Sequence, residues 1–294
     1  MLVAILPRNE KQLQPMTDQQ LYKFATDFLL SFDKITQDDL NIHLTSEYKK
    51  PKDLKTIYKR LCVSAQNKQM GPQVIGNSIG GIDNLKKVLS DFDPHKVAAN
   101  YEKADVEPLL KDIKKKLNPS GKFRTTSKSL WTLFAKPVID SAHFLKSFDT
   151  AESFYEWANF FANDTRAKPA LPLMISIEIN GIGFPLACDF LKELGFTEYG
   201  KPDVHVKDIF KALNIINNKE NNTTKQNYAT LKAIDRIAKS NNVTPYAVDK
   251  VFWLIGSGNF YITEKNIGRQ KQNFIDKLKK QKTQPLTKHC PKPG

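Results

Sequence analysis

The stretch LPLMISIEINGIGFPLACDFLKELGFTEYGKPDVHVKDIF, residues 171–210, decides the fold of this chain. It contains a short turn, NGIG at residues 180–183, between two apolar runs. Glycine lets the backbone turn tightly and expose its N–H groups, because no Cβ blocks the approach. After the turn, apolar residues recur at three- and four-residue steps, which predicts a helix over residues 184–194 with Pro185 in its first turn and Gly195 at its end. The two glycines of the turn therefore lie where free amides and the positive end of a helix dipole meet, and such a place binds anions.

Two interpretations of this turn compete. A dinucleotide-binding glycine turn follows a buried strand, and LMISIEI at residues 173–179 is apolar enough for one. That motif wants a third Gly or Ala three residues after the second Gly, but Leu186 stands there and Ala187 follows one residue later. Nothing else in the chain alternates short β runs with helices, as a doubly wound sheet requires. The other interpretation is a helix-hairpin-helix that grips a nucleic-acid phosphate through backbone N–H groups.

Residues 179–187, INGIGFPLA, resemble the hairpin of the helix-hairpin-helix, Gly/Pro-rich loop and Asp superfamily of DNA glycosylases. The family hairpin reads apolar-Pro-Gly-apolar-Gly, two variable positions, a small polar residue and Ala, and here Asn180 replaces the usual Pro. The family continues with an Asp in a Val-Asp-Thr-His-Val-like string, and PDVHV at residues 202–206 supplies Asp203 at the family's spacing. Two further stretches are similar to family helices: LCVSAQ at residues 61–66 and VDKVFW at residues 248–253.

The pattern of the whole chain is all-α, with no repeats and few convincing strands. The resemblance implies two helical lobes, with the active site in the cleft between them and the hairpin and Asp203 at its mouth. We expect a central lobe over residues 60–200 that ends in the helix-hairpin-helix at about residues 171–195. The N- and C-terminal segments, residues 1–59 and 201–294, are expected to form the second lobe together.

Other stretches carry simpler expectations. The apolar residues 130–148 predict a pair of helices around Pro137, the polar residues 217–227 predict a linker, and the chain from Lys265 onward is basic and poor in large apolar residues. The helix predicted over residues 150–162 carries a stripe of aromatic residues, which is typical of a core and, in the alternative, of a platform on which bases stack. The stripe consists of Phe154, Trp157, Phe160 and Phe161.

Asp203 is the candidate catalytic residue. Cleaving a base from deoxyribose builds positive charge on the sugar, and a carboxylate near the anomeric carbon stabilises that charge and can orient or deprotonate a water. Its simpler role is an N-cap for the helix that follows, and the two roles are compatible. Family members that also cut the DNA backbone carry a hairpin lysine, two residues after the second Gly, whose amine forms a Schiff base with the sugar. Pro185 occupies that position here, so the resemblance implies hydrolysis by water without strand cleavage; Lys192 and Lys201 are the nearby lysines whose position could change this.

The predicted DNA contacts come from the hairpin, from the end of a helix over residues 53–68 and from a polar, basic loop at residues 118–129. The resemblance places Gln66 near the gap left by an extruded base, and a solvated, inert helix end is the alternative. The loop has the basic and hydroxyl side chains that suit phosphate contacts, although it could be a surface connection only. The predicted DNA-binding residues are Asn180, Gly181, Ile182, Gly183, Gln66, Lys122, Arg124 and Lys201.

The composition of the chain indicates which class of partner it binds and which covalent or metal-bound features it lacks. The chain has 294 residues, 40% of them hydrophobic, and a formal charge of +14, which describes a globular protein suited to a polyanion, although solvating lysines give the same balance. Its three cysteines, Cys62, Cys188 and Cys290, are far apart, which argues against a disulfide scaffold and against the iron–sulfur loop of some family members. His289 and Cys290 are too sparse for a zinc site. We therefore expect no metal and no cofactor.

No apolar run approaches the length of a membrane span, so we expect a cytoplasmic protein (nucleoid-associated if bacterial), away from membranes and monomeric. The leading hypothesis is a monofunctional DNA glycosylase that acts on double-stranded DNA containing a lesion. The alternative is a non-catalytic DNA-binding protein on the same scaffold, and a third hypothesis is an enzyme that binds a nucleotide cofactor at the glycine turn. Oxidised purines, alkylated purines and mismatched pyrimidines all stay open as the target base.

Overall fold

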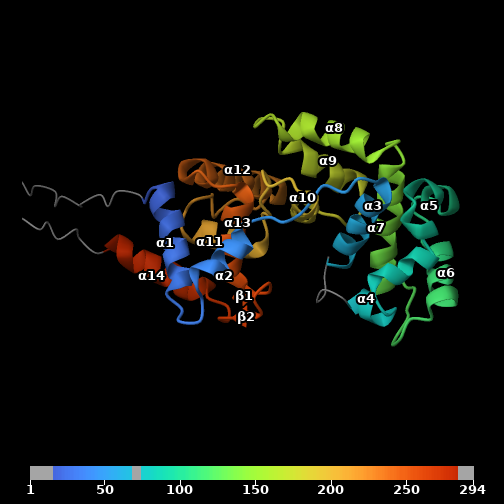
Figure 1. The fold of residues 1–294 in the computed structure, drawn as a ribbon, viewed down its shortest axis with the longest axis horizontal. Helices are drawn as coiled ribbons and strands as arrows, with labels where there is room; N and C mark the ends of the chain where they lie inside the picture. The colour runs from blue at the N-terminus through green and yellow to red at the C-terminus, as the bar shows by residue number, and fades with distance from the viewer. Residues whose placement is uncertain (1–15, 68–73, 284–294) are drawn as a thin grey trace, which may run out of the picture.

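The computed structural model describes residues 16–67 and 74–283, with side chains up to residue 280 at the C-terminal end. Helices dominate the described chain (Figure 1), and its only paired strands form a two-residue antiparallel ladder of β1 (Asn259–Phe260) with β2 (Lys265–Asn266). The predicted all-α fold class is therefore confirmed. The α-helices are α1 (Asp18–Leu30), α2 (Gln37–Leu44), α3 (Leu54–Gln66), α4 (Val74–Ser78), α5 (Pro94–Asn100), α6 (Glu107–Leu117), α7 (Leu130–Leu145), α8 (Ala151–Ala162), α9 (Ala170–Glu178), α10 (Phe184–Glu193), α11 (Val204–Ala212), α12 (Thr223–Asn241), α13 (Pro245–Ser257) and α14 (Lys271–Thr283). Two short 3₁₀ helices are η1 (Ile82–Lys87) and η2 (Ser90–Phe92).

Buried apolar side chains gather in two clusters, which define two lobes (Figure 1). The hairpin lobe is built from α3 to α10, and the terminal lobe from α1, α2 and α11 to α14. Leu231 of α12 is an exception, because it belongs to the cluster of the hairpin lobe. The two-lobed helical architecture is confirmed, and the residue boundaries that we expected between the lobes stay a prediction.

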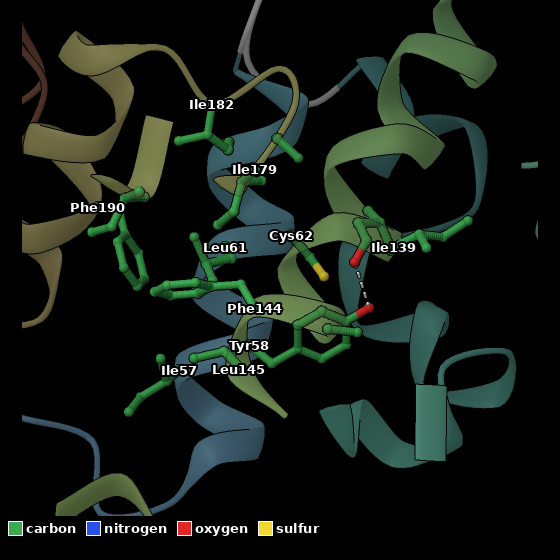
Figure 2. Packing of buried hydrophobic residues seen from close by; sticks show 14 of the residues in the cluster. Ile57, Tyr58, Leu61, Cys62, Ile139, Phe144, Leu145, Ile179, Ile182 and Phe190 are labelled. Carbon is green, nitrogen blue, oxygen red and sulfur yellow. Dashed lines mark hydrogen bonds between the residues drawn. The ribbon is translucent and has the colours of Figure 1, made fainter. Parts of the chain in front are cut away.

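Helix α3 forms the centre of the hairpin lobe (Figure 2). Its apolar residues recur at helical spacing, so that Ile57, Tyr58 and Leu61 are fully buried on one face. The hydroxyl of Tyr58 donates a hydrogen bond to the backbone carbonyl of Val138, at 3.0 Å, which satisfies its polar group inside the core. The same core holds Ile182 of the turn, so the hairpin is anchored directly against α3.

Helix α7 differs from the prediction of two helices around Pro137. It is one helix over Leu130–Leu145 with the proline inside it. A proline in a helix interior removes one hydrogen bond and is unfavourable by roughly 3 kcal/mol in isolation. Most of α7 is buried, and this packing outweighs the local preference for a break.

Helix α9 settles the alternatives for the run before the glycine turn. Residues 173–179 lie in or directly after the helix Ala170–Glu178 and form no strand. A dinucleotide-binding turn needs a strand there, so that interpretation of the turn is wrong. Helices α9 and α10 with the turn between them form the predicted helix-hairpin-helix, seen near the centre of Figure 1.

The C-terminal part of the chain is more ordered than its composition suggested. Helix α12 begins at Thr223, capped by Asn222, so the predicted linker is shorter than residues 217–227. In α14 the few large apolar residues lie on one face, and Phe274 and Leu278 are fully buried in the terminal lobe. His289 and Cys290 lie outside the described residues.

The aromatic stripe of α8 belongs mainly to the core. Phe154 is fully buried, and Trp157 makes an edge contact with Phe144 of α7 at a centroid distance of 5.7 Å. Phe160 is 74% exposed and points away from this core. The interpretation of the stripe as packing therefore holds for Phe154 and Trp157, while Phe160 is a surface side chain.

Candidate nucleic-acid interface and active site

The glycine turn presents free backbone amides at the start of α10. Gly181 has a φ of 107°, a conformation that side chains other than glycine rarely adopt. Gly183 is the N-cap of α10 and has no side-chain cap. A Cβ added to Gly183 would meet nothing closer than Cδ of Pro185, at 3.9 Å, so its surroundings are open. Among the described residues, neither the N–H of Gly181 nor that of Gly183 has a hydrogen-bond partner, which leaves both available to an anion.

The other two residues of the turn have structural partners. Ile182 is fully buried, and its N–H donates to the carbonyl of Ile179 at 3.0 Å, so it contributes packing rather than an exposed amide. The exposed Asn180 donates its N–H to Oδ2 of Asp140, at 3.0 Å. Of the predicted hairpin contacts, the structure leaves the amides of Gly181 and Gly183 open.

Asp203 is the N-cap of α11. Its Oδ1 accepts a hydrogen bond from the N–H of Val206 at 3.0 Å, so the capping role foreseen for it is present. The carboxylate is half-buried and its neighbour Val204 is 59% exposed, so Asp203 is not sealed in the interior. Burial, and next the negative charge of Asp249, raise the pKa of Asp203 above its ordinary value. A carboxyl group in this state is rigidly held and close to a second carboxylate.

His205, two residues later, packs directly against α13 inside the terminal lobe. A Cβ added to Gly256 of α13 would lie 2.5 Å from Cβ of His205, so only glycine allows α11 and α13 to approach this closely. The Nδ1 atom of His205 is buried and has no hydrogen-bond partner among the described residues. His205 is therefore a packing residue that fixes the start of α11 next to Asp203.

A pocket of about 460 Å³ lies where the two lobes meet. Helix α10 of the hairpin lobe and helix α13 of the terminal lobe supply most of its wall. Its lining residues are Tyr48, Asn67, Asp189, Lys192, Glu193, Lys201, Tyr246, Asp249, Lys250, Trp253, Asn259 and Tyr261. Asp203 does not line the pocket, but Lys201 and Asp249, whose charges act on it, both do.

A buried ion-pair network crosses this pocket. The Nζ of Lys192 lies 2.5 Å from Oδ2 of Asp249 and 3.1 Å from Oδ1 of Asp189, and Lys201 pairs with Asp189 at 2.8 Å. Burial lowers the pKa of Lys192, but the attraction of Asp249 and Asp189 outweighs it and holds the pKa well above its ordinary value. Lys192 is therefore a charged structural group and not a free amine that could attack a sugar.

Three residues that line the same pocket each carry a buried oxygen without a hydrogen-bond partner in the described part of the chain. Oδ1 of Asn67, Oε2 of Glu193 and Oδ1 of Asp249 are buried and have no hydrogen-bond partner among the described residues. Burial, and next the charge of Asp189, raise the pKa of Glu193 to about 7. Buried polar atoms normally have partners, so these oxygens mark places where a bound group can donate hydrogen bonds.

The remaining predicted DNA contacts come from a helix end, a surface loop and the pocket. Oε1 of Gln66 is buried without a partner in the described chain, while the next residue, Asn67, lines the pocket. Lys122 and Arg124 are exposed in the loop between α6 and α7, which is tied to α4 by the hydrogen bond from Ser78 to the carbonyl of Ser120. Lys201 is a pocket residue rather than a surface contact.

Sequence reasoning missed most of the pocket. Asp249 and Trp253 lie in the stretch VDKVFW that resembles a family helix, so this stretch carried the available signal. Tyr48 and Tyr261 come from loops that only the fold brings together. In the described residues, no group of three or more His, Cys, Asp or Glu side chains is placed to hold a metal ion, and no helix there has both the length and the apolar character to cross a bilayer.

Comparisons with known proteins give a weak structural likeness. No protein-family model matches the chain, and no curated protein matches its sequence. The 8-oxoguanine glycosylase/lyase of Methanocaldococcus jannaschii, solved in complex with a 15mer DNA containing 8-oxoguanine, is similar with a TM-score of 0.49 and 18% identity, over 80% of this chain and 95% of that one. A second structure of the 8-oxoguanine DNA glycosylase of that organism has a TM-score of 0.49 and 16% identity, over 81% of this chain and 94% of the other. At this identity and TM-score, the likeness assigns neither a substrate nor a mechanism to this chain.

Proposed function

We propose that the chain is a monofunctional DNA glycosylase, which removes a damaged or mismatched base from double-stranded DNA by hydrolysis of the N-glycosidic bond. The observation that carries this proposal is the position of Asp203. Its carboxylate caps α11 and is partly exposed to solvent. Burial, and next the charge of Asp249, which lines the inter-lobe pocket, raise its pKa. The free amides of Gly181 and Gly183 add a place for a phosphate. The protein acts as a monomer in this proposal.

In the proposed reaction the ionised Asp203 faces the sugar. Departure of the base leaves positive charge on the ring oxygen and C1′, which the carboxylate stabilises. Asp203 also orients or deprotonates the water that attacks C1′. The hydrogen bond from the N–H of Val206 holds the carboxylate still while this happens.

The inter-lobe pocket is the proposed site of the extruded base. A base inside a duplex cannot be reached, so it must leave the stack and enter a pocket. Trp253 of α13 is a partly exposed aromatic residue of the pocket wall, and a base can stack on its ring. The unpaired oxygens of Asn67, Glu193 and Asp249 favour a base that presents N–H donors, since such a base would satisfy them.

The absence of strand cleavage is part of the proposal. Pro185, in the first turn of α10, has no nucleophile at the position where the resemblance expects one. Lys192 is buried and paired with two carboxylates. Water is therefore the proposed nucleophile, and the product is an abasic site in an intact strand.

A second candidate is a DNA-binding protein without catalysis. Asp203 has a complete structural role as an N-cap, and its raised pKa reflects a carboxylate in an unfavourable surrounding. The hairpin also departs from the family pattern at Asn180 and Pro185. This candidate predicts salt-sensitive duplex binding and no released base.

The test is a panel of duplexes that each carry one damaged or mismatched base, scored for strand breaks with and without alkali. The proposed function predicts breaks for at least one lesion, only after alkali. Asp203→Asn should abolish them and keep duplex binding. Binding without base release from any lesion would establish the second candidate, and no binding to any duplex would overturn both.

A further inference from the structure

Asp140 of α7 is a buried carboxylate that the proposed chemistry does not use. It is only 7% exposed, and its Oδ2 accepts the hydrogen bond from the N–H of Asn180, at 3.0 Å. The two residues are far apart in the sequence and belong to different elements. This bond reaches from the most buried helix of the lobe to the first residue of the glycine turn.

The position of Asn180 explains why such a partner is needed. An N–H at this place has lost its helical partner, because α9 ends at Glu178 and Ile179 is already extended, with φ −111° and ψ 98°. A proline here, as in the hairpins that the turn resembles, has no N–H to satisfy and fixes its own φ. Asn180 has an N–H that needs a partner and a backbone that is freer than that of proline. The hydrogen bond to Asp140 satisfies the N–H and restrains the backbone.

Neighbouring groups partly offset the cost of burying the Asp140 carboxylate in the core. Burial raises the pKa of Asp140, while the hydrogen bond from the N–H of Asn180 and next the positive charge of Lys103 oppose that shift. Lys103, Lys136, Asp140 and Asn180 share the wall of a cavity of about 390 Å³ beside the turn. Asp140 thus sits directly at the edge of the surface that the hairpin presents.

We propose that Asp140 is the positioning residue of the hairpin, which holds the first amide of the turn so that the amides of Gly181 and Gly183 point at a DNA phosphate. This inference rests on the proposed function, because it assumes that the hairpin binds DNA. Asp140 acts through Asn180 and does not itself touch the nucleic acid.

The negative charge of Asp140 and its hydrogen bond to Asn180 should have opposite effects on DNA binding. Removing a carboxylate from a DNA-binding surface normally strengthens binding, because it removes repulsion with the phosphates. The proposal predicts the opposite for Asp140→Ala, a loss of duplex affinity of about tenfold, because the turn loses its anchor. Asp140→Asn removes the same charge and keeps an acceptor oxygen for the amide. It should bind at least as tightly as the wild type.

A rescue variant isolates the hydrogen bond. In the double variant Asp140→Ala with Asn180→Pro, the unsatisfied amide is gone and the proline ring fixes the turn. Ile179 is already extended and lies close to the conformation that a following proline requires. Binding should therefore return to near the wild-type affinity, which a general loss of folding cannot explain.

The experiment measures the dissociation constant for an undamaged duplex by fluorescence anisotropy, and the rate of base release at saturating enzyme. Asp140→Ala should weaken duplex binding by a larger factor than it slows base release at saturating enzyme. Asp164→Ala, which removes a carboxylate that also accepts a backbone N–H in another loop of the same lobe, is the matched control and should not weaken binding. Should Asp140→Ala not fold, Asp140→Ser, too short to reach the amide, takes its place and is expected to show the same loss.

The outcomes separate the two proposals. If the wild type binds the duplex but the Ala and Asn variants bind equally well, the anchor is overturned and the proposed function stands. Failure of the proline rescue in a folded protein also overturns the anchor. If the wild type itself binds no duplex, both proposals fail.

Discussion

The Nζ of Lys192 lies 2.5 Å from Oδ2 of Asp249, and this ion pair joins α10 of the hairpin lobe to α13 of the terminal lobe. Both side chains are nearly inaccessible, at 5% and 2% exposure. A pair with so little solvent is strongly coupled, because neither charge can be rehydrated when the other is lost. The pair therefore fixes how the two lobes meet around the pocket that they share.

Breaking this pair should destabilise the protein strongly. Lys192→Met leaves Asp249 buried with an unpaired charge, and the free energy of unfolding should fall by about 3–5 kcal/mol in a urea titration. The pair of Lys271 and Asp208 has the same 2.5 Å distance but is 33% and 44% exposed, so Lys271→Met should change stability by less than about 1 kcal/mol. Equal falls in unfolding free energy for the two variants would show that burial does not make the Lys192–Asp249 pair more important for stability.

The stability of the protein should fall with rising pH because of Glu193. Its carboxyl group ionises near 4.5 in the unfolded chain and near 7 in the folded one, so the folded state binds more protons between these values. The stabilisation is complete below pH 4.5 and is lost as pH rises through 7, by about 2 kcal/mol after discounting for partial solvent screening. Glu193→Gln should flatten the dependence of the unfolding free energy on pH between about pH 4 and about pH 8, values on either side of that window. The exposed Glu156→Gln serves as control, and an unchanged slope in the Glu193 variant would contradict the assignment.

The stacking role of the pocket can be tested at Trp253. If an extruded base stacks on this ring, Trp253→Ala should slow base release by about tenfold or more, since such stacking contributes roughly 1–3 kcal/mol. Affinity for an undamaged duplex should not change, because no base is extruded. Phe160→Ala removes a ring that is 74% exposed and lies on α8, and it should affect neither measurement. Equal effects of the two variants would remove the pocket from the mechanism.

The fold was predictable where the local signals agree with one another. Helix α3 shows this, because the predicted helix starts at Asp53, which is the N-cap in the structure, and its apolar face is continuous. The helix before the turn was harder, since its apolar run fits a strand as well as a helix until the fold is known. Pro137 misled for a related reason, because burial of α7 outweighs the local effect of a proline.

Only those residues of the candidate site that lie close together in the sequence could be predicted. The hairpin and Asp203 lie close together in the sequence, so a resemblance to one family pattern could indicate both. The pocket depends on α10 meeting α13, and the pairing of Lys192 with Asp249 has no local signature. The role of Asp140 was hidden in the same way, because a single aspartate inside an apolar helix gives no sign of the distant amide that it binds.

Asp203 is the proposed catalytic residue, and its substitution tests that role directly. Asp203→Asn should lower the rate of base release by about 10²–10⁴, while duplex affinity is kept, because the amide still caps α11 but carries no charge. The pKa of Asp203 is raised above its ordinary 3.8, so the ionised form is lost as pH falls through the raised value. Base release should therefore decline on the acid side, at a higher pH than an unperturbed aspartate would give. A wild-type rate that stays constant down to pH 3.8 would exclude Asp203 as the ionised group.

Pro185→Lys should add strand cleavage to the enzyme. The side chain of residue 185 is partly exposed in the first turn of α10, next to the open amide of Gly183. Proline at this place contributes no N–H to the helix, so its replacement removes no hydrogen bond. A lysine there places an amine at the position where the resemblance expects a Schiff base with the sugar.

The Pro185→Lys variant should cut lesion-bearing duplexes without alkali and become trapped on them by borohydride. Leu186→Lys adds the same charge one residue further along the helix, at a side chain that packs against the core of the hairpin lobe, and it should do neither. Trapping of both variants would indicate nonspecific capture of an abasic site, and trapping of neither would show that the hairpin does not face the sugar.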